Sequence, residues 1–353
     1  MKKILLFSLS AVLLLGCQSA LASIEKVKNV DVAGIYAKKV KLEWQAVDSA
    51  EHYQVKIMRK RDGHYNTVRK VTADTNSKLV KKLKAETKYY FKVRAYNSGQ
   101  YGPYSKKVSA TTNAAAEPTV ADANIIFLHH STGENIWNGG VSSWFEDYNA
   151  NHGINYQIAE QAFPKDDPYG WNNYPYDYWN IWVNNAGDNE YLDEPTLEIL
   201  TASYDVIVFK HCFPVSGIEE NVGADISSDY KSIENYELQY NTLKDKMHEF
   251  PNTKFIVWTG AALISGETNE EQATRAQEFF SWVKDTWDED GDNIYVWDFY
   301  QLETEGGLYM LDEHSAGDSH PNEEFSQEVA PYFSQRVADV INGNGDTGNL
   351  TGE

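Results

Sequence analysis

The sequence predicts two folded domains of different class, an antiparallel β-sandwich followed by a three-layer α/β/α domain with a parallel five-stranded sheet. Short runs that alternate apolar and polar residues fill residues 24–113, as in antiparallel sandwiches. Strand-like apolar runs alternate with helical segments in residues 123–342, as in parallel α/β sheets. The charge also changes, from 20 Lys and Arg against 8 Asp and Glu in residues 24–116 to 9 against 44 in residues 117–353. We therefore predict a domain boundary there, with a linker at residues 114–122.

The first 22 residues have the pattern of an export signal. Lys2 and Lys3 precede an apolar run, Ile4 to Leu15, that is too short for a stable membrane span. The run ends in Leu14-Leu15-Gly16-Cys17, which resembles the bacterial lipobox, whose cysteine is acylated. The resemblance implies an exported protein anchored through Cys17 at the outer membrane or cell surface. The alternative is a soluble secreted or periplasmic protein, because Ala20-Leu21-Ala22 also looks like an ordinary cleavage site.

The basic region contains three clear period-two runs, at Val40–Trp44, Tyr53–Ile57 and Phe91–Ala95. The pattern from Leu83 through Tyr89 to Asn97, followed by Gly99 and Gly102, resembles a fibronectin type III domain. In that family a tryptophan like Trp44 is buried in strand B, and a tyrosine like Tyr89 forms the tyrosine corner.

The fibronectin-like family acts as a spacer or binding module, and the resemblance implies no chemistry for residues 24–113. The 20 basic residues leave two interpretations open. They form a solvated face, or they bind an anionic surface such as a polyanionic glycan or lipid headgroups. The net charge of −21 on the whole chain argues against nucleic-acid binding.

The acidic region reads as alternating strands and helices. Buried-type strands are expected at residues 124–128, 154–158, 205–209, 254–258 and 293–297. Helices are expected near residues 138–150, 194–202, 229–249, 270–287 and 322–341. Residues 343–353 are polar and Gly-rich, which predicts a flexible tail.

Three polar segments fall where sites form in parallel sheets, beyond the carboxyl ends of strands. His129–Gly133 follows the first strand and Lys210–Pro214 follows the third. Asp318–Asn322 precedes the last helix. A hydroxyl, an imidazole and a carboxylate are therefore expected to converge at one edge of the sheet.

This order resembles the SGNH (GDSL-like) hydrolase family, in which a serine follows strand one and a late Asp-x-x-His-Pro precedes the final helix. The resemblance implies that Ser131 is the nucleophile and His320, followed by Pro321, is the base. Asp318 stands two residues before His320, and Gly317 occupies the family's Asp position. Either Asp318 or a backbone carbonyl therefore orients the imidazole. The candidates for the oxyanion hole and pocket are Gly133, Lys210, His211 and Cys212.

Residues 163–182 form an aromatic-rich insertion with eight aromatic side chains and three prolines. No sustained helical period is visible, so we expect a long loop, which is usually functional inside a compact domain. Aromatic faces with neighbouring amides suit sugar rings, although the same rings can form a local core under the loop. The substrate-binding candidates are Tyr169, Trp171, Tyr174, Tyr176, Trp179 and Trp182.

Together these patterns predict an exported serine esterase that acts on acylated carbohydrate and needs no cofactor. Two alternatives remain open. One is a non-catalytic glycan-binding surface lipoprotein on the same fold. The other is a metal-dependent hydrolase with ligands drawn from His130, His211, His320 and Asp318, for which no compact ligand-spacing motif is present.

Overall fold

The structure is a computed structural model that describes residues 24–353, except residues 37, 62, 114–118, 173 and 347–348. The predicted signal peptide and Cys17 lie outside the described residues. The chain divides into two compact units between residues 116 and 117, at the point where the charge changes sign. Each unit has a hydrophobic core of its own. Among the described residues, no helix combines the length and apolarity needed to cross a bilayer.

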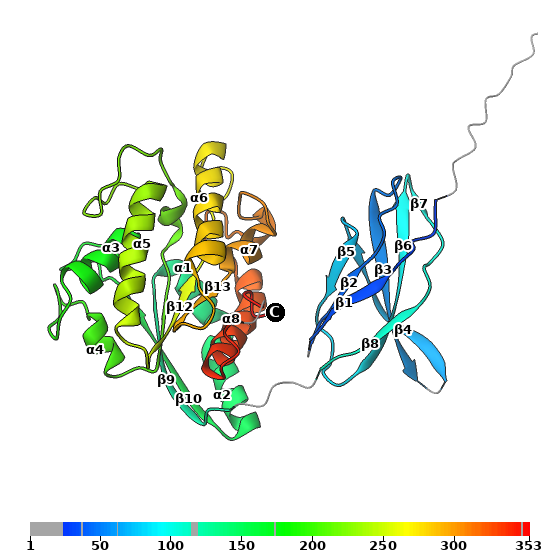
Figure 1. Ribbon diagram of the computed structural model, residues 1–353, viewed down its shortest axis with the longest axis horizontal. Coiled ribbons are helices and arrows are strands. Elements are labelled where there is room, and N and C mark those ends of the chain that lie inside the picture. The colour runs from blue at the N-terminus through cyan, green and yellow to red at the C-terminus, as the bar shows by residue number, and fades with distance from the viewer. Residues whose placement is uncertain (1–23, 37, 62, 114–118, 173, 347–348) are drawn as a thin grey trace, which may run out of the picture. The chain divides into compact units, whose positions relative to one another are not determined.

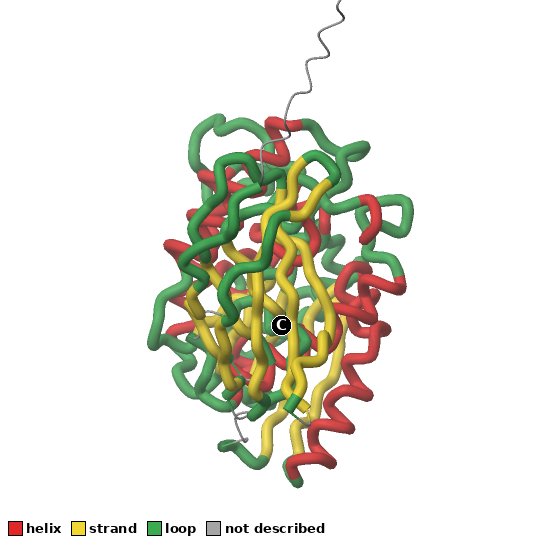
Figure 2. The backbone as a smooth tube through the Cα atoms, turned by 90° about the vertical axis from the view of Figure 1, so that its right-hand side faces the viewer, coloured by secondary structure: helices red, strands yellow, loops and turns green. Residues whose placement is uncertain are grey.

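The first unit is an antiparallel β-sandwich, and Figure 2 shows its strands as extended tubes. One sheet has the order β1-β2-β5, and the other has the order β4-β3-β6-β7 with β8 also paired to β6. The strands are β1 (Asp31–Ile35), β2 (Val40–Glu43), β3 (His52–Arg61), β4 (His64–Ala73), β5 (Ser77–Val80), β6 (Lys88–Asn97), β7 (Gln100–Tyr101) and β8 (Val108–Thr111).

The sandwich core follows from the alternation in its strands. In β6, Tyr89, Phe91 and Val93 are buried, while the residues between them face outward. Trp44 packs in the same core, with its ring edge-on to Tyr53. The hydroxyl of Tyr89 accepts a hydrogen bond of 3.0 Å from the backbone N–H of Lys84, five residues upstream. This contact fixes the chain before β6, as a tyrosine corner does.

The second unit contains a five-stranded parallel sheet of order β10-β9-β11-β12-β13 (Figure 1). Each strand lies within a few residues of the position that the sequence predicts. Their bounds are β9 (Asp122–His129), β10 (Asn155–Ala162), β11 (Val206–Phe209), β12 (Lys254–Trp258) and β13 (Ile294–Trp297).

Helices cover both faces of this sheet because successive strand residues point to opposite sides. Ile126 and Leu128 of β9 belong to a core shared with α3, α5 and α6. Ile125 and Phe127 belong to a second core, shared with α1, α2 and α8. The α-helices are α1 (Ser131–Ile136), α2 (Ser142–His152), α3 (Pro175–Trp179), α4 (Leu197–Thr201), α5 (Ile233–His248), α6 (Glu270–Trp282), α7 (Phe299–Thr304) and α8 (Glu323–Ile341). Shorter helical turns are η1 (Trp137–Val141), η2 (Asn180–Asn184), η3 (Phe213–Ser216), η4 (Val283–Trp287) and η5 (Asp312–His314).

The C-terminal segment differs from the predicted flexible tail. The buried guanidinium of Arg336 on α8 donates to the carbonyl of Gly345 at 2.6 Å. Farther along, the backbone N–H of Asp298 donates to the carbonyl of Leu350, and the indole of Trp297 donates to that of Thr351. The described residues of this segment therefore pack on the unit. A polar composition does not predict this packing, because backbone carbonyls supply most of the contacts.

Candidate active site

The first two predicted segments meet at the carboxyl edge of the sheet. Strand β9 ends at His129, and Ser131 is the first residue of α1. The neighbouring strand β11 is followed by Cys212. The hydroxyl of Ser131 lies 3.1 Å from the thiol sulfur of Cys212, within hydrogen-bond distance.

The third segment joins the same edge through two contacts. The side-chain amide of Asn135 on α1 donates to the carbonyl of Pro321 at 2.7 Å. The ring of Phe213 packs edge-on against the imidazole of His320, with centroids 4.9 Å apart. Ser131, Cys212 and His320 therefore border one region. Ser131 and His320 share no hydrogen bond among the described residues, and the side-chain partner of Ser131 is Cys212.

Asp318 holds both the backbone and the ring of His320. One carboxylate oxygen accepts the backbone N–H of His320 at 2.9 Å, and the other lies 3.1 Å from Nδ1. These bonds, the backbone one first, lower the pKa of Asp318. Gly317 makes the geometry possible, because its φ of +109° belongs to a turn closed by Ser315. The carboxylate therefore reaches His320 from two residues away.

A buried residue anchors this turn to the neighbouring strand. Ser319 is fully buried, and its hydroxyl bonds the carboxylate of Glu267 and accepts the backbone N–H of Ile264. Both partners belong to the loop after β12. The turn that carries Asp318 and His320 is thus fixed on both sides, because Asn135 holds its other end through Pro321.

Behind Ser131 lies a buried polar cluster of Lys210, Cys212 and Glu303. Burial raises the pKa of Cys212, but the Lys210 ammonium and hydrogen bonds from Ser131 and Thr132 oppose this and bring it to about 7. Lys210 is itself fully buried, and burial lowers its pKa. Burial also raises the pKa of Glu303 well above its usual range, although its carboxylate accepts the backbone N–H of Ala262 at 2.7 Å. The cluster places a cationic group near the thiol that contacts Ser131.

Two predicted pocket candidates have other roles. Gly133 is buried inside α1, where a Cβ would lie 2.4 Å from the Cβ of His129, and its N–H already donates to the carbonyl of His130. Its backbone N–H is therefore already engaged within the first turn of α1. His211 is fully buried and bonds the hydroxyl of Tyr240 at 2.9 Å. Its ring also packs against Tyr178 and Phe209 in the core.

The metal-binding alternative is not assembled. His130 bonds the carbonyl of Pro164, His211 bonds Tyr240, and His320 bonds Asp318. Within the part of the chain that the structure describes, no three His, Cys, Asp or Glu side chains are grouped to hold a metal ion.

The aromatic insertion reaches the candidate site through one stack. The ring of Trp171 lies parallel to the imidazole of His130, with centroids 4.1 Å apart and planes inclined by 17°. The stack joins the insertion to the residue that precedes Ser131. Tyr169, Tyr174 and Tyr176 are partly buried against the core of this side of the sheet. These four residues keep a surface that a ligand can reach.

The remaining two aromatic candidates are core residues. Trp182 is fully buried, and its indole donates to the carbonyl of Pro195. Trp179 is 7% exposed and belongs to the same core. Their prediction as sugar-binding residues is wrong. The segment also contains α3 and η2, where a loop was expected, because its apolar rings cover one face of the sheet.

A hollow of about 380 Å³ is lined in part by Phe213, whose ring packs against His320. Lys231 reaches it, donating to the carbonyl of Pro214 at 3.0 Å with its ammonium 4.7 Å from the ring centre of Tyr174. The same rule that located the other segments could have found part of it, since Glu267 follows the fourth strand. Its lining is Phe213, Pro214, Gly217, Glu219, Lys231, Leu263, Glu267 and Gln272.

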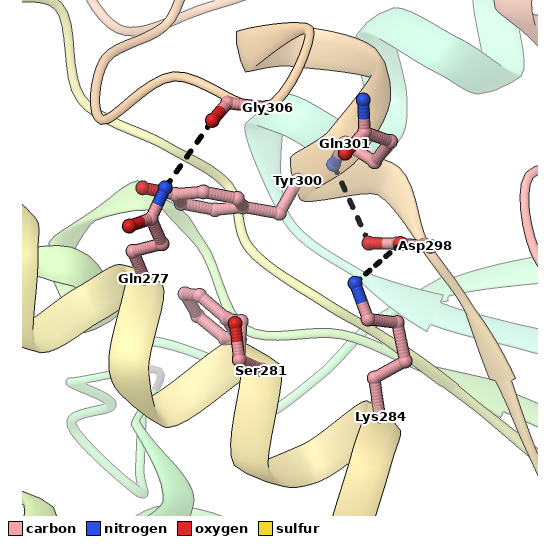
Figure 3. A pocket seen from close by; sticks show the side chains of 8 residues that line it. Gln277, Ser281, Lys284, Asp298, Tyr300, Gln301 and Gly306 are labelled. Carbon is pink, nitrogen blue, oxygen red and sulfur yellow. Dashed lines mark hydrogen bonds and ion pairs between the residues drawn. The ribbon is translucent and has the colours of Figure 1, made fainter. Parts of the chain in front are cut away.

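A smaller hollow of about 200 Å³ lies between α6 and α7 (Figure 3). Three of its polar side chains, Lys284, Asp298 and Gln277, already have partners. Lys284 forms an ion pair of 3.1 Å with Asp298, and Asp298 also caps α7 by accepting the backbone N–H of Gln301. Gln277 donates to the carbonyl of Gly306 across the opening. We interpret this hollow as structural.

Comparison with known proteins identifies the first unit. Residues 25–111 match the family of the fibronectin type III domain, so the chain has an N-terminal domain of this type, as predicted. No curated protein matches the chain.

Among the solved structures similar to the chain are fibronectin type III domains. The FN1–FN3 domains of chicken CNTN1 are 26% identical, with 26% of this chain and 31% of that chain covered and a TM-score of 0.22. This chain thus spans about a third of the chicken chain. The FN5 domain of Drosophila Lar is 19% identical, with 26% and 99% covered and a TM-score of 0.24. A domain of human fibronectin type III domain containing protein 3 is 23% identical, with 29% and 97% covered and a TM-score of 0.25.

Proposed function

We propose that residues 123–342 form an ester hydrolase of the SGNH (GDSL-like) type that acts on acylated carbohydrate. The observation that carries the proposal is the Asp318–His320 pair, held at the sheet edge where Ser131 begins α1. A serine hydroxyl is a weak nucleophile until an imidazole takes its proton, and a carboxylate on Nδ1 leaves Nε2 free to accept it. Asp318 engages Nδ1 of His320, and Nε2 forms no hydrogen bond among the described residues.

In this mechanism Ser131 Oγ attacks the acyl carbonyl carbon while His320 Nε2 accepts the hydroxyl proton. The tetrahedral intermediate collapses, the ester C–O bond breaks, and His320 returns the proton to the leaving sugar hydroxyl. Water then attacks the acyl-enzyme with His320 again as base, which releases the carboxylic acid and restores Ser131. The Ser131 hydroxyl, which contacts Cys212, must turn towards His320 for the first step.

The developing oxyanion needs donors that are already in place. The backbone N–H of Ser131 is at the first position of α1, where helical N–H groups lack intrahelical partners. The buried Lys210 ammonium, close to Cys212, adds positive charge behind this position. Together they would stabilise the negative charge on the oxyanion.

The hollow beside Phe213 supports a sugar as the leaving group. Its volume of about 380 Å³ suits a small polar ring, and the carboxylates of Glu219 and Glu267 offer acceptors to hydroxyls. Tyr174 presents a ring face that Lys231 already contacts. The acidic surroundings disfavour a strongly anionic substrate at this site.

A second function is favoured by one observation, the contact of Ser131 with Cys212 in place of His320. A protein that keeps this arrangement would bind glycan without hydrolysing its ester. The two functions differ in whether Ser131 reacts.

Labelling with a fluorophosphonate probe tests the proposal. We expect labelling of the parent chain that chelator does not prevent and that Ser131→Ala abolishes. Ser131→Ala and His320→Ala should each lower kcat/KM on a soluble aryl acetate by about a thousandfold or more. Ser143→Ala, an exposed serine on α2, is the matched control and should keep full labelling. Absence of labelling in a folded parent chain would leave the glycan-binding function.

We also propose that the protein is exported and lipid-anchored through Cys17, which lies outside the described residues. Incorporation of labelled palmitate by cells expressing the chain, lost in Cys17→Ala, is the expected result. Secretion of both forms without label would favour a soluble protein.

A further inference from the structure

The charge of the fibronectin type III domain is concentrated on one sheet. The three ten-residue strands β3, β4 and β6 together contain nine Lys and Arg and no Asp or Glu. The opposite sheet, β1-β2-β5, contains both signs, including an ion pair of 3.1 Å between Lys41 and Glu43. The excess of positive charge therefore lies on the sheet that contains β3, β4 and β6.

The register aligns three lysines on adjacent strands. Lys56 of β3 stands opposite Lys70 of β4 on one side and Lys92 of β6 on the other. Lys56 and Lys92 alternate with buried residues and so point away from the sandwich core, and Lys70 is exposed between two half-buried residues. We call Lys70, Lys56 and Lys92 the lysine row. Its members are about 4.8 Å apart along the sheet, the usual distance between strands.

The lysine row has no neutralising partner within the described residues. None of its three side chains forms an ion pair there. Like charges directly opposite each other destabilise a sheet. An arrangement that costs folding energy and lacks internal compensation points to an external anion with repeated charges.

Tyrosines flank the lysine row on the same face. Tyr65 and Tyr90 lie edge to face, with centroids 4.8 Å apart, and the ammonium of Lys107 is 3.4 Å from the ring centre of Tyr65. Towards the other end of β6, the guanidinium of Arg94 is 3.8 Å from the ring centre of Tyr101. Tyr65 and Tyr101 are 44% and 43% exposed. Rings beside cations offer apolar contact for sugar C–H faces together with charge for acidic groups.

We propose that this face of the fibronectin type III domain binds an anionic polysaccharide, with the lysine row contacting its carboxylate or sulfate groups. The charge complementarity and the exposed tyrosines carry the inference. It does not depend on the hydrolase proposal, because all residues involved belong to the other unit.

Binding of the full chain to polygalacturonate, with neutral dextran as the uncharged comparison, tests the proposal. We expect binding to polygalacturonate at low salt, release as salt rises, and no binding to dextran. Each cation that contacts a polyanion adds roughly one to the slope of log affinity against log salt. The triple variant Lys56→Ser, Lys70→Ser, Lys92→Ser should therefore lose about three from this slope and at least about tenfold in affinity at low salt.

The matched control removes the same charge from outside the face. Lys28→Ser, Lys41→Ser, Lys78→Ser should change the affinity by less than about twofold, because these lysines lie before β1 and on the opposite sheet. Equal loss in both triple variants would overturn the assigned face. If the parent chain does not bind polygalacturonate at low salt, the proposed polysaccharide ligand is wrong. This holds whether or not the chain binds phosphatidylglycerol vesicles.

Discussion

Replacing Asp318 by asparagine tests how the base is oriented. In the parent chain the two carboxylate oxygens accept from the backbone N–H and from Nδ1 of His320, at 2.9 and 3.1 Å. An amide has one oxygen. The backbone N–H of His320 can only donate, so it keeps its hydrogen bond to that oxygen. The amide NH₂ then faces Nδ1 and donates to it. The ring proton moves to Nε2, which can no longer accept the proton of Ser131.

The size of the effect follows from the exposure of the pair. A hydrogen bond to a charged group contributes about 1.5–3 kcal/mol, which corresponds to a factor of roughly 10 to 150. In buried triads the same substitution costs about 10⁴ because the wrong tautomer is enforced. The Asp318 side chain is 51% exposed, so water competes for Nδ1. We therefore expect Asp318→Asn to lower kcat/KM by about a hundredfold.

The assay is hydrolysis of a soluble aryl acetate at neutral pH, with circular dichroism to verify folding. Asp318→Ala should lose less activity than Asp318→Asn, because water can accept the Nδ1 proton and preserve the tautomer. Asp312→Asn, an exposed acid of η5, is the matched control and should have parental activity. Activity of Asp318→Asn within about threefold of the parent, in an enzyme that Ser131→Ala inactivates, would refute the role of Asp318. A backbone carbonyl would then orient His320.

Three further outcomes follow from the same contacts. Gly133→Ala should destabilise the second unit by about 1–3 kcal/mol in urea unfolding, since its Cβ would lie 2.4 Å from that of His129. Gly266→Ala, which has open space around it, should not destabilise the unit. Equal urea midpoints for the two variants would contradict this packing. Burial raises the pKa of Glu303 in the folded state, so the unfolded chain releases this proton at lower pH than the folded chain. The free energy of unfolding of the parent chain should therefore fall as pH rises above about 4.5. Glu303→Gln should make the free energy of unfolding depend less on pH. An unchanged slope would argue that Glu303 is ionised in the folded state. A chain lacking residues 24–113 should keep its kcat/KM on the aryl acetate, because every candidate catalytic residue lies in the second unit, and a tenfold loss would assign the first unit a part in catalysis.

The main strands and helices of both units were predictable from the sequence. The five strands of the second unit appear as short apolar runs because parallel strands are buried on both faces, and the run at residues 205–209 closely matches β11. The fibronectin type III domain was recognisable because period-two alternation is a local property that survives without tertiary context. The contact between α1 and the segment before α8, made by Asn135 and Pro321, agrees with the rule that loops at the carboxyl edge of a parallel sheet lie close together.

Which polar and aromatic side chains can contact a ligand depends on the tertiary structure. Composition made Trp171 and Trp182 equivalent, yet Trp171 stacks on His130 near the site and Trp182 is fully buried. Cys212 similarly gave no sign of its contact with Ser131, which is 81 residues away in sequence. The C-terminal segment packs through backbone carbonyls, which carry no sequence signal. These outcomes depend on how strands and loops distant in sequence meet in three dimensions, and burial and partner choice are fixed only at that stage.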